Sequence, residues 1–159
     1  MSETDPILRP MDLALAEAEA AAARGETPVG AVLLDAAGRL LAADGNRVRE
    51  LLDPTAHAEM LVIRAAAQAL GSERLTGTRL YVTLEPCPMC AGAIAHARIA
   101  RLYYGADDPK GGGVIHGPRV FSQPTCHHRP EVYEGIGAEA SANLLRRFFA
   151  ERRGRGEAG

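Results

Sequence analysis

The chain has 159 residues, 47% of them hydrophobic and 24% charged, and it carries a formal net charge of −2 with a pI near 6.2. This length suits a single domain over residues 1–159, and no apolar run approaches the roughly 18 residues that a membrane span needs. The weak net charge excludes a molecule whose overall field attracts nucleic acid, so a polyanionic partner would need a local basic patch.

The N-terminal half contains both helical and strand patterns. Its acidic start, residues 1–5, leads to no apolar segment of a secretory signal, so we expect a cytoplasmic protein. The pattern then predicts a helix, a two-stranded hairpin, an irregular polar segment and a second helix, at about residues 10–24, 28–35 with 39–44, 45–54 and 55–70. Thr55 is the expected N-cap of the second helix, and Gly71 is its expected stop.

The C-terminal half predicts a strand, a helix and a further strand, which implies a parallel crossover. A long loop, a short strand and a closing helix follow, so that the six segments are residues 79–84, 86 or 88 to 97, 99–104, 105–130, 131–134 and 138–153. The crossover indicates a mixed sheet with helices packed on it. We expect the chain ends, residues 1–8 and 154–159, to be disordered.

Two short motifs contain the residues with the most chemical potential, Thr55-Ala-His57-Ala-Glu59 and Glu85-Pro-Cys87-Pro-Met-Cys90. Cys87 and Cys90 are three residues apart, so on the first turn of a helix their sulfurs share a face and can bind one ion. With the imidazole of His57 they supply three ligands for Zn²⁺. A structural zinc site normally closes with a fourth protein ligand, whereas a catalytic site leaves that position for water.

Glu59 is the spare carboxylate beside these ligands. It is two residues from His57, about 200° around an ideal helix, so the two side chains do not chelate one ion as an i, i+4 pair would. This spacing suits a carboxylate that is held off the metal but close to its water. Such a group can accept a proton from the water and return it to a leaving group.

Each motif alone has a simpler interpretation. A lone Cys-x-x-Cys is also typical of a redox pair or of half a structural zinc site, and His-x-Glu on a helix is common. The conjunction of both motifs in this order, with Pro86 directly before the first cysteine, is much more specific. The cluster Cys126-His127-His128, with His116 upstream, could be a second metal site, but we favour a polar loop near the active site.

Taken together, these residues resemble the signature of the zinc-dependent nucleobase deaminases, and among them the tRNA adenosine deaminases. The resemblance covers roughly residues 10–153, nearly the whole chain. The matching segments are Pro28-Val-Gly-Ala-Val, Asn46-Arg47, Asp53-Pro-Thr-Ala-His-Ala-Glu59, Leu80-Tyr-Val-Thr-Leu-Glu-Pro-Cys87, Met89-Cys-Ala-Gly92 and Phe148-Phe149.

The resemblance implies a cytidine deaminase-like fold, with three layers in the order α/β/α and a mixed central sheet of about five strands that has helices on both faces. It also implies hydrolysis of adenosine to inosine at the wobble position of a tRNA anticodon. One Zn²⁺ per subunit would be held by His57, Cys87 and Cys90, Glu59 would transfer protons, and Asn46 would bind the base. The family acts as a homodimer in which the partner subunit helps to form the RNA surface.

Contacts with an anticodon stem-loop require groups that meet phosphate, ribose and splayed bases. The residues that correspond to RNA contacts of the resembled family are Asp107, Asp108, Lys110, Phe149, Arg152 and Arg153. Each has a simpler interpretation as well, since Asp-Asp-Pro is an ordinary turn and a helix end favours arginine through its dipole. Phe148 follows Leu144 and Leu145 at helical spacing, so we assign it to the core.

Two other functions remain open at this point. A deaminase of the same fold could act on a small molecule such as guanine, cytosine or adenosine. Alternatively, the zinc could stabilise an interaction module that has no turnover. A module of that kind would need a fourth ligand, such as Cys126 or His128, and would have no use for an unliganded Glu59.

Overall fold

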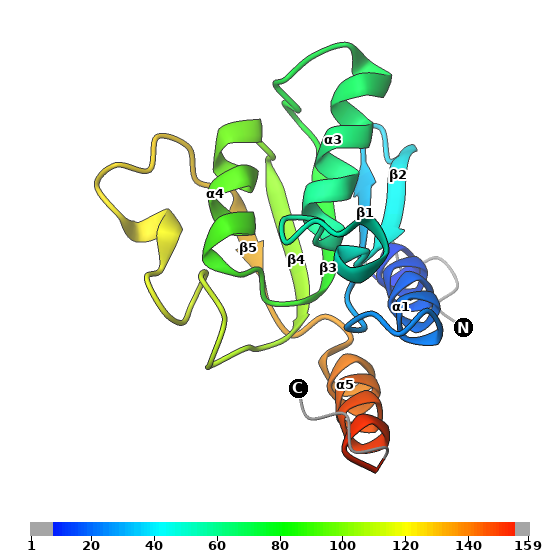
Figure 1. The fold of residues 1–159 in the computed structure, drawn as a ribbon. Helices are drawn as coiled ribbons and strands as arrows, with labels where there is room; N and C mark the ends of the chain where they lie inside the picture. Colours follow the sequence, from blue (N-terminus) through cyan, green and yellow to red (C-terminus); the bar gives the residue numbers. More distant parts are fainter. Residues whose placement is uncertain (1–7, 155–159) are drawn as a thin grey trace.

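A mixed sheet of five strands runs through residues 8–154, the part of the chain that the computed structural model describes (Figure 1). The strands are β1 (Gly30–Leu34), β2 (Leu40–Gly45), β3 (Arg79–Leu84), β4 (Arg101–Ala106) and β5 (Glu131–Tyr133). They follow the order β2-β1-β3-β4-β5, with β1 antiparallel to β2 and β3, and β4 parallel to β3 and β5. The predicted hairpin, parallel crossover and mixed sheet are confirmed.

Helices cover both faces of this sheet. They are α1 (Leu8–Ala23), α2 (Val48–Leu51), α3 (Ala58–Leu70), α4 (Pro88–Ala97) and α5 (Ala138–Gly154), together with the 3-10 helix η1 (Val120–Ser122). Figure 1 shows α3 and α4 on one face, α1 on the other, and α5 extending beyond one end of the sheet. Within the described residues no helix is both long and apolar enough to cross a membrane.

The alternation of side chains along β1 places it between two apolar cores. Ala31 and Leu33 pack on the side of α3 and α4, whereas Val32 and Leu34 pack with Met11 of α1 on the opposite side. All five residues of the strand are buried. A strand covered on both faces is continuously apolar, and the sequence of β1 has this character.

Two glycines allow α1 to lie directly against the sheet. A Cβ atom at Gly30 would come within 1.9 Å of the Ala14 carbonyl oxygen, and one at Gly45 would come within 2.6 Å of the Glu17 carbonyl oxygen. Neither distance is sterically possible for a side chain. The close packing of α1 on β1 and β2 therefore depends on glycine at both positions.

The structure corrects the predicted start of α3. Its N-cap is His57, whose backbone is extended, and the amide of the first helical residue, Ala58, donates to Oδ1 of Asn46 at 2.8 Å. Thr55 instead donates from its amide and its hydroxyl to Oδ1 of Asp53, at 2.8 and 2.7 Å. The cap is thus supplied by a residue distant in the sequence, and His57 lies at the helix terminus itself.

Other differences concern segments without a clear period. The stretch predicted to be irregular, residues 45–54, contains the short helix α2, and η1 lies within the long loop 105–130. The expected disorder of residues 1–8 and 154–159 falls almost wholly on residues 1–7 and 155–159, which are outside the described part of the chain. Leu8 and Gly154, which are described, lie at ends of α1 and α5.

Candidate active site

Three potential metal ligands meet where α3 and α4 begin. His57 is the N-cap of α3, Cys87 is the N-cap of α4, and Cys90 lies in the first turn of α4. Nδ1 of His57 is 3.6 Å from Sγ of Cys87 and 3.5 Å from Sγ of Cys90. A tetrahedral zinc ion holds sulfur at about 2.3 Å and nitrogen at about 2.0 Å, which places such ligand atoms roughly 3.6 Å apart. The three residues therefore fit zinc in both chemistry and spacing.

The two thiols of this cluster differ in acidity. The hydrogen bond from Cys90, which outweighs the effect of burial, and the contact with His57 lower the pKa of Cys87 to about 4. The same thiol contact, together with burial, raises the pKa of Cys90. Zinc binds cysteine as the thiolate, so an ion that enters this site must displace any proton that remains on the two thiols. Zinc binding at this site consequently depends on pH.

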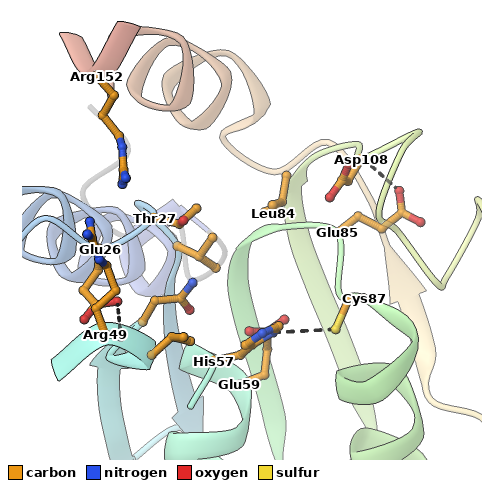
Figure 2. A pocket seen from close by; sticks show the side chains of 13 residues that line it. Glu26, Thr27, Arg49, His57, Glu59, Leu84, Glu85, Cys87, Asp108 and Arg152 are labelled. Atoms are coloured by element: carbon orange, nitrogen blue, oxygen red, sulfur yellow. Dashed lines mark hydrogen bonds between the residues drawn. The ribbon is translucent and has the colours of Figure 1, made fainter. Parts of the chain in front are cut away.

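Glu59 lies in the first turn of α3, next to the metal ligands but not among them. Its side chain converges with His57 and Cys87 in Figure 2, and only 3% of the residue is exposed. Within the described residues, the one cluster of histidine, cysteine and acidic side chains that could hold a metal does not include it. Burial raises the pKa of Glu59 to about 7, against the opposing effects of a backbone amide and His57. A carboxyl group with this pKa can accept and return a proton near neutral pH.

A cavity of about 340 Å³ opens beside Glu59 and the ligands (Figure 2). It is lined by Glu26, Thr27, Val29, Asn46, Val48, Arg49, His57, Glu59, Leu84, Glu85, Cys87, Asp108 and Arg152. Asn46 is 8% exposed, and because its Oδ1 accepts from Ala58 the orientation of its amide is fixed. The Nδ2 group is therefore the free donor for a ligand in the cavity.

The carboxylate of Glu85 connects the zinc motif with the loop that follows β4. Its side chain is fully buried and accepts from the amides of Asp108, Val114, Ile115 and His116 at 3.0 to 3.1 Å. Nδ1 of His116 donates to the same carboxylate at 2.7 Å. Burial alone would raise the pKa of Glu85, but these donors outweigh it and hold that pKa below its ordinary value. The loop after β4 is thus held by hydrogen bonds to Glu85, two residues before Cys87.

The cluster of histidines and Cys126 forms no second metal site in the described part of the chain. His116 is bonded to Glu85, the thiol of Cys126 donates to the carbonyl of His128 at 3.1 Å, and Nε2 of His128 donates to the Ile99 carbonyl at 2.7 Å. These contacts support the polar-loop interpretation. A non-catalytic zinc module would require Cys126 or His128 as a fourth ligand. Neither residue belongs to the zinc cluster.

The residues predicted to contact RNA fall into two groups. Asp108 and Arg152 line the cavity, and Arg152 points toward it from α5 (Figure 2). The other four are exposed and do not line it: Asp107, Lys110, Phe149 and Arg153. Phe148 is buried as predicted, whereas its neighbour Phe149 is 40% exposed.

Sequence reasoning missed several residues of the cavity wall. Glu26 is 2% exposed and accepts from the amides of Arg49 and Glu50 at 3.1 and 2.9 Å, so it fixes α2 against the cavity. No local sequence pattern predicts this role, because the amides that Glu26 accepts from lie more than 20 residues further along the chain. Glu85, by contrast, stands directly before Pro86 and Cys87, and that position was a usable signal.

Known proteins resemble this chain over most of its length. A family model described as the cytidine and deoxycytidylate deaminase zinc-binding region matches residues 6–106. The tRNA-specific adenosine deaminase of Agrobacterium fabrum is 64% identical over 144 residues, which are 90% of this chain and 93% of that protein. A structure from studies of A-to-I editing by tRNA:A34 deaminases is 62% identical, with a TM-score of 0.85, over 86% of this chain and 99% of that chain.

A more distant structural relative acts on a free base. Guanine deaminase from Bacillus subtilis is 30% identical, with a TM-score of 0.63, and the match covers 96% of this chain and 95% of that one. Both tRNA enzymes are therefore more similar to this chain in sequence than this guanine deaminase is, and the structure from the editing studies is also more similar in shape.

Proposed function

We propose that this chain, which belongs to the cytidine and deoxycytidylate deaminase family, is a zinc-dependent hydrolase. Its reaction converts adenosine to inosine at the wobble position of a tRNA anticodon. The observation that carries the chemistry is the convergence of a three-ligand zinc cluster and a buried carboxyl group on one cavity. The observation that carries the substrate is the 64% identity with a tRNA-specific adenosine deaminase over nearly its full length.

His57, Cys87 and Cys90 hold the zinc ion. When bound, the ion supplies Lewis acidity that makes water a stronger nucleophile. Glu59 would accept a proton from the attacking water as its oxygen bonds to C6 of adenine, and it would return that proton to the amino nitrogen as the C6–N bond breaks. Adenosine and water thereby give inosine and ammonia. The raised pKa of Glu59 suits both directions of this transfer.

Asn46 orients the base in this proposal. Its Oδ1 is held by the Ala58 amide, so Nδ2 can donate to a ring nitrogen of the purine. Because the α3 cap occupies Oδ1, the amide of Asn46 acts mainly as a donor toward the base. The apolar side chains of Val29, Val48 and Leu84 line the same cavity, where a purine ring can pack.

Contacts at the cavity mouth are proposed to select RNA. The carboxylate of Asp108 can accept from a ribose hydroxyl, and Arg152 can meet a phosphate. The remaining predicted contacts are exposed on the loop after β4 and at the end of α5, where they can reach nucleotides outside the cavity: Asp107, Lys110, Phe149 and Arg153.

The assembly and setting are further parts of the proposal. We infer a cytoplasmic homodimer with one zinc ion per subunit, in which the partner subunit completes the RNA surface as the family resemblance implies. We also infer that the chain acts as a single catalytic domain. Both apolar cores pack against the same sheet, which supports a single domain.

A direct assay separates this function from its nearest alternative. Zinc-loaded protein is incubated with an anticodon stem-loop that carries a wobble adenosine and, in parallel, with free adenosine, guanine and cytosine, and the products are measured by mass spectrometry. We expect inosine in the stem-loop only. Turnover of guanine or another free base with an inert stem-loop would favour the small-molecule deaminase, the reading that the likeness to guanine deaminase suggests.

A further inference from the structure

A second cavity, of about 420 Å³, adjoins the one that holds the zinc cluster. The two share Arg49 and Arg152, which line both. The second cavity lies between the end of α1, the short helix α2 and the last turns of α5, and the residues around it are Ala22, Ala23, Arg24, Gly25, Arg49, Phe148, Glu151 and Arg152.

The charge of the two cavities differs strongly. Three arginines and a single acidic residue, Glu151, line the second cavity. Four carboxylic acids, Glu26, Glu59, Glu85 and Asp108, line the first, together with only the two shared arginines. The balance of charge is therefore more positive in the second cavity, which favours a phosphate group there, while an uncharged base can enter the first.

Contacts with the protein hold the arginines of this cavity in place. Nη2 of Arg24 donates to the Asn46 carbonyl at 3.1 Å, and its Nε is 3.7 Å from the Glu50 carboxylate. Nη1 of Arg49 donates to the carbonyl of Gly25 at 3.3 Å. A guanidinium group has five N–H donors, so these contacts position Arg24 and Arg49 without using all of their donors.

The third arginine comes from the opposite side of the cavity. The guanidinium of Arg152 lies 5.2 Å from the centre of the Phe148 ring, and in Figure 2 the side chain points from α5 toward Arg49. The rigid fork of a guanidinium matches the oxygens of a phosphate, and several such groups around one hollow are a common way to bind it.

We propose that Arg24, Arg49 and Arg152 form a subsite for the phosphodiester group next to the wobble nucleotide, whose base occupies the zinc cavity. The inference rests on the proposed function. It explains how a chain of net charge −2 binds a polyanion, because the positive charge is concentrated beside the reactive base. It also provides a reason for preferring RNA over a free base, since a free base has no phosphate to occupy the subsite.

Binding measurements in salt test the subsite. The Glu59→Gln protein, loaded with zinc, is used because its slow turnover leaves the stem-loop intact during the measurement, and its affinity is measured from low to moderate salt. We expect Arg24→Gln and Arg49→Gln, each added to this background, to weaken binding about 3- to 10-fold. In the double variant the salt slope should fall by about 0.7, the value for one phosphate contact of a single strand. Arg74→Gln, an exposed charge that lines neither cavity, is the matched control and should change neither quantity.

A modified RNA tests the same contact without relying on variants that fold poorly. A neutral methylphosphonate is placed at the linkage on either side of the wobble nucleotide, one linkage at a time. We expect one of these substitutions to weaken binding to the Glu59→Gln protein and to have little further effect on the double arginine variant. Purely additive effects at both linkages would overturn the subsite.

Two other outcomes are separable. If Arg24 serves only to hold Asn46 and Glu50, Arg24→Gln will weaken binding with an unchanged salt slope and Arg24→Lys will not restore it, and the subsite is then wrong. If the unsubstituted protein neither binds nor deaminates the stem-loop, the proposed function itself fails. Deamination by the unsubstituted protein, with arginine variants that bind like the control, rejects the subsite alone.

Discussion

Replacing Glu85 with glutamine tests whether one buried carboxylate fastens the loop after β4 to the zinc motif. One of its oxygens, Oε2, accepts from three successive amides, those of Val114, Ile115 and His116. The other, Oε1, accepts from the Asp108 amide and from Nδ1 of His116. Glutamine keeps one acceptor oxygen and turns the other into an NH₂ donor, which cannot accept from the amide that faces it.

The expected cost follows from these five hydrogen bonds. If the glutamine oxygen stays with the three amides, the Asp108 amide loses its acceptor in a partly buried place, which costs about 1–3 kcal/mol. His116 can change tautomer and accept from the new NH₂ group. The remaining bonds lose the strength that the negative charge gives them, about 1 kcal/mol or more in total. We therefore expect the free energy of unfolding to fall by about 3 kcal/mol.

The effect must also depend on pH. The pKa of Glu85 in the folded protein lies below its ordinary value of 4.5, so the ionised carboxylate stabilises the fold above that pH. The stabilisation is lost as the pH falls from about 4.5 through the folded pKa, because the carboxylate is then protonated in both states. The difference between the original protein and Glu85→Gln should accordingly shrink as the solution becomes more acidic across this range.

Urea unfolding of the zinc-loaded proteins, followed by circular dichroism at several pH values, measures both quantities. Glu73→Gln removes the same charge at an exposed position and serves as the control, with an expected change near zero. A loss below about 1 kcal/mol for Glu85→Gln would show that the carboxylate contributes only the net worth of an ordinary hydrogen bond. A difference that does not vary with pH would contradict the role of its charge.

Three further predictions address the active site and the helix packing. Glu59→Gln should lower the single-turnover rate of inosine formation about 10²- to 10⁴-fold with zinc content unchanged by metal analysis, and loss of zinc would contradict its place outside the ligand set. Asn46→Ala should raise KM and destabilise the fold by about 1–2 kcal/mol, whereas Asn46→Asp keeps the acceptor for the Ala58 amide and should raise KM with a smaller loss in thermal unfolding. Gly30→Ala should lower the melting temperature sharply because its Cβ would strike the Ala14 carbonyl, while Gly92→Ala meets no atom within 4 Å and should not lower it.

The zinc cluster could be predicted from the sequence because its geometry is largely local. Cys87 is the N-cap of α4 and Cys90 lies in its first turn, where a spacing of three residues brings their sulfurs to one face. The pattern of strand, helix and strand around them implied the parallel crossover that the structure has. The role of His57 was harder to predict, because its position near Cys87 depends on the fold. The resemblance to a known family supplied the assignment of His57 as the third ligand.

The tertiary structure alone decided the contacts between residues far apart in the chain. The start of α3 was misplaced at Thr55 because its capping acceptor, Asn46, lies on another segment. The five donors on Glu85 come from a loop without a regular period, and no sequence rule predicts which amides will face a carboxylate.

The second cavity, beside the active site, also depends on contacts that only the tertiary structure decides. Arg24, Arg49 and Arg152 belong to three separate parts of the chain, and the sequence shows only that each is an arginine near the end of a helix or in a polar segment. The sequence determined the ligands and the reaction class, since these depend on residue type and short spacing. The fold decided which charges gather around the cavity, because long-range packing brings together side chains that local spacing cannot relate.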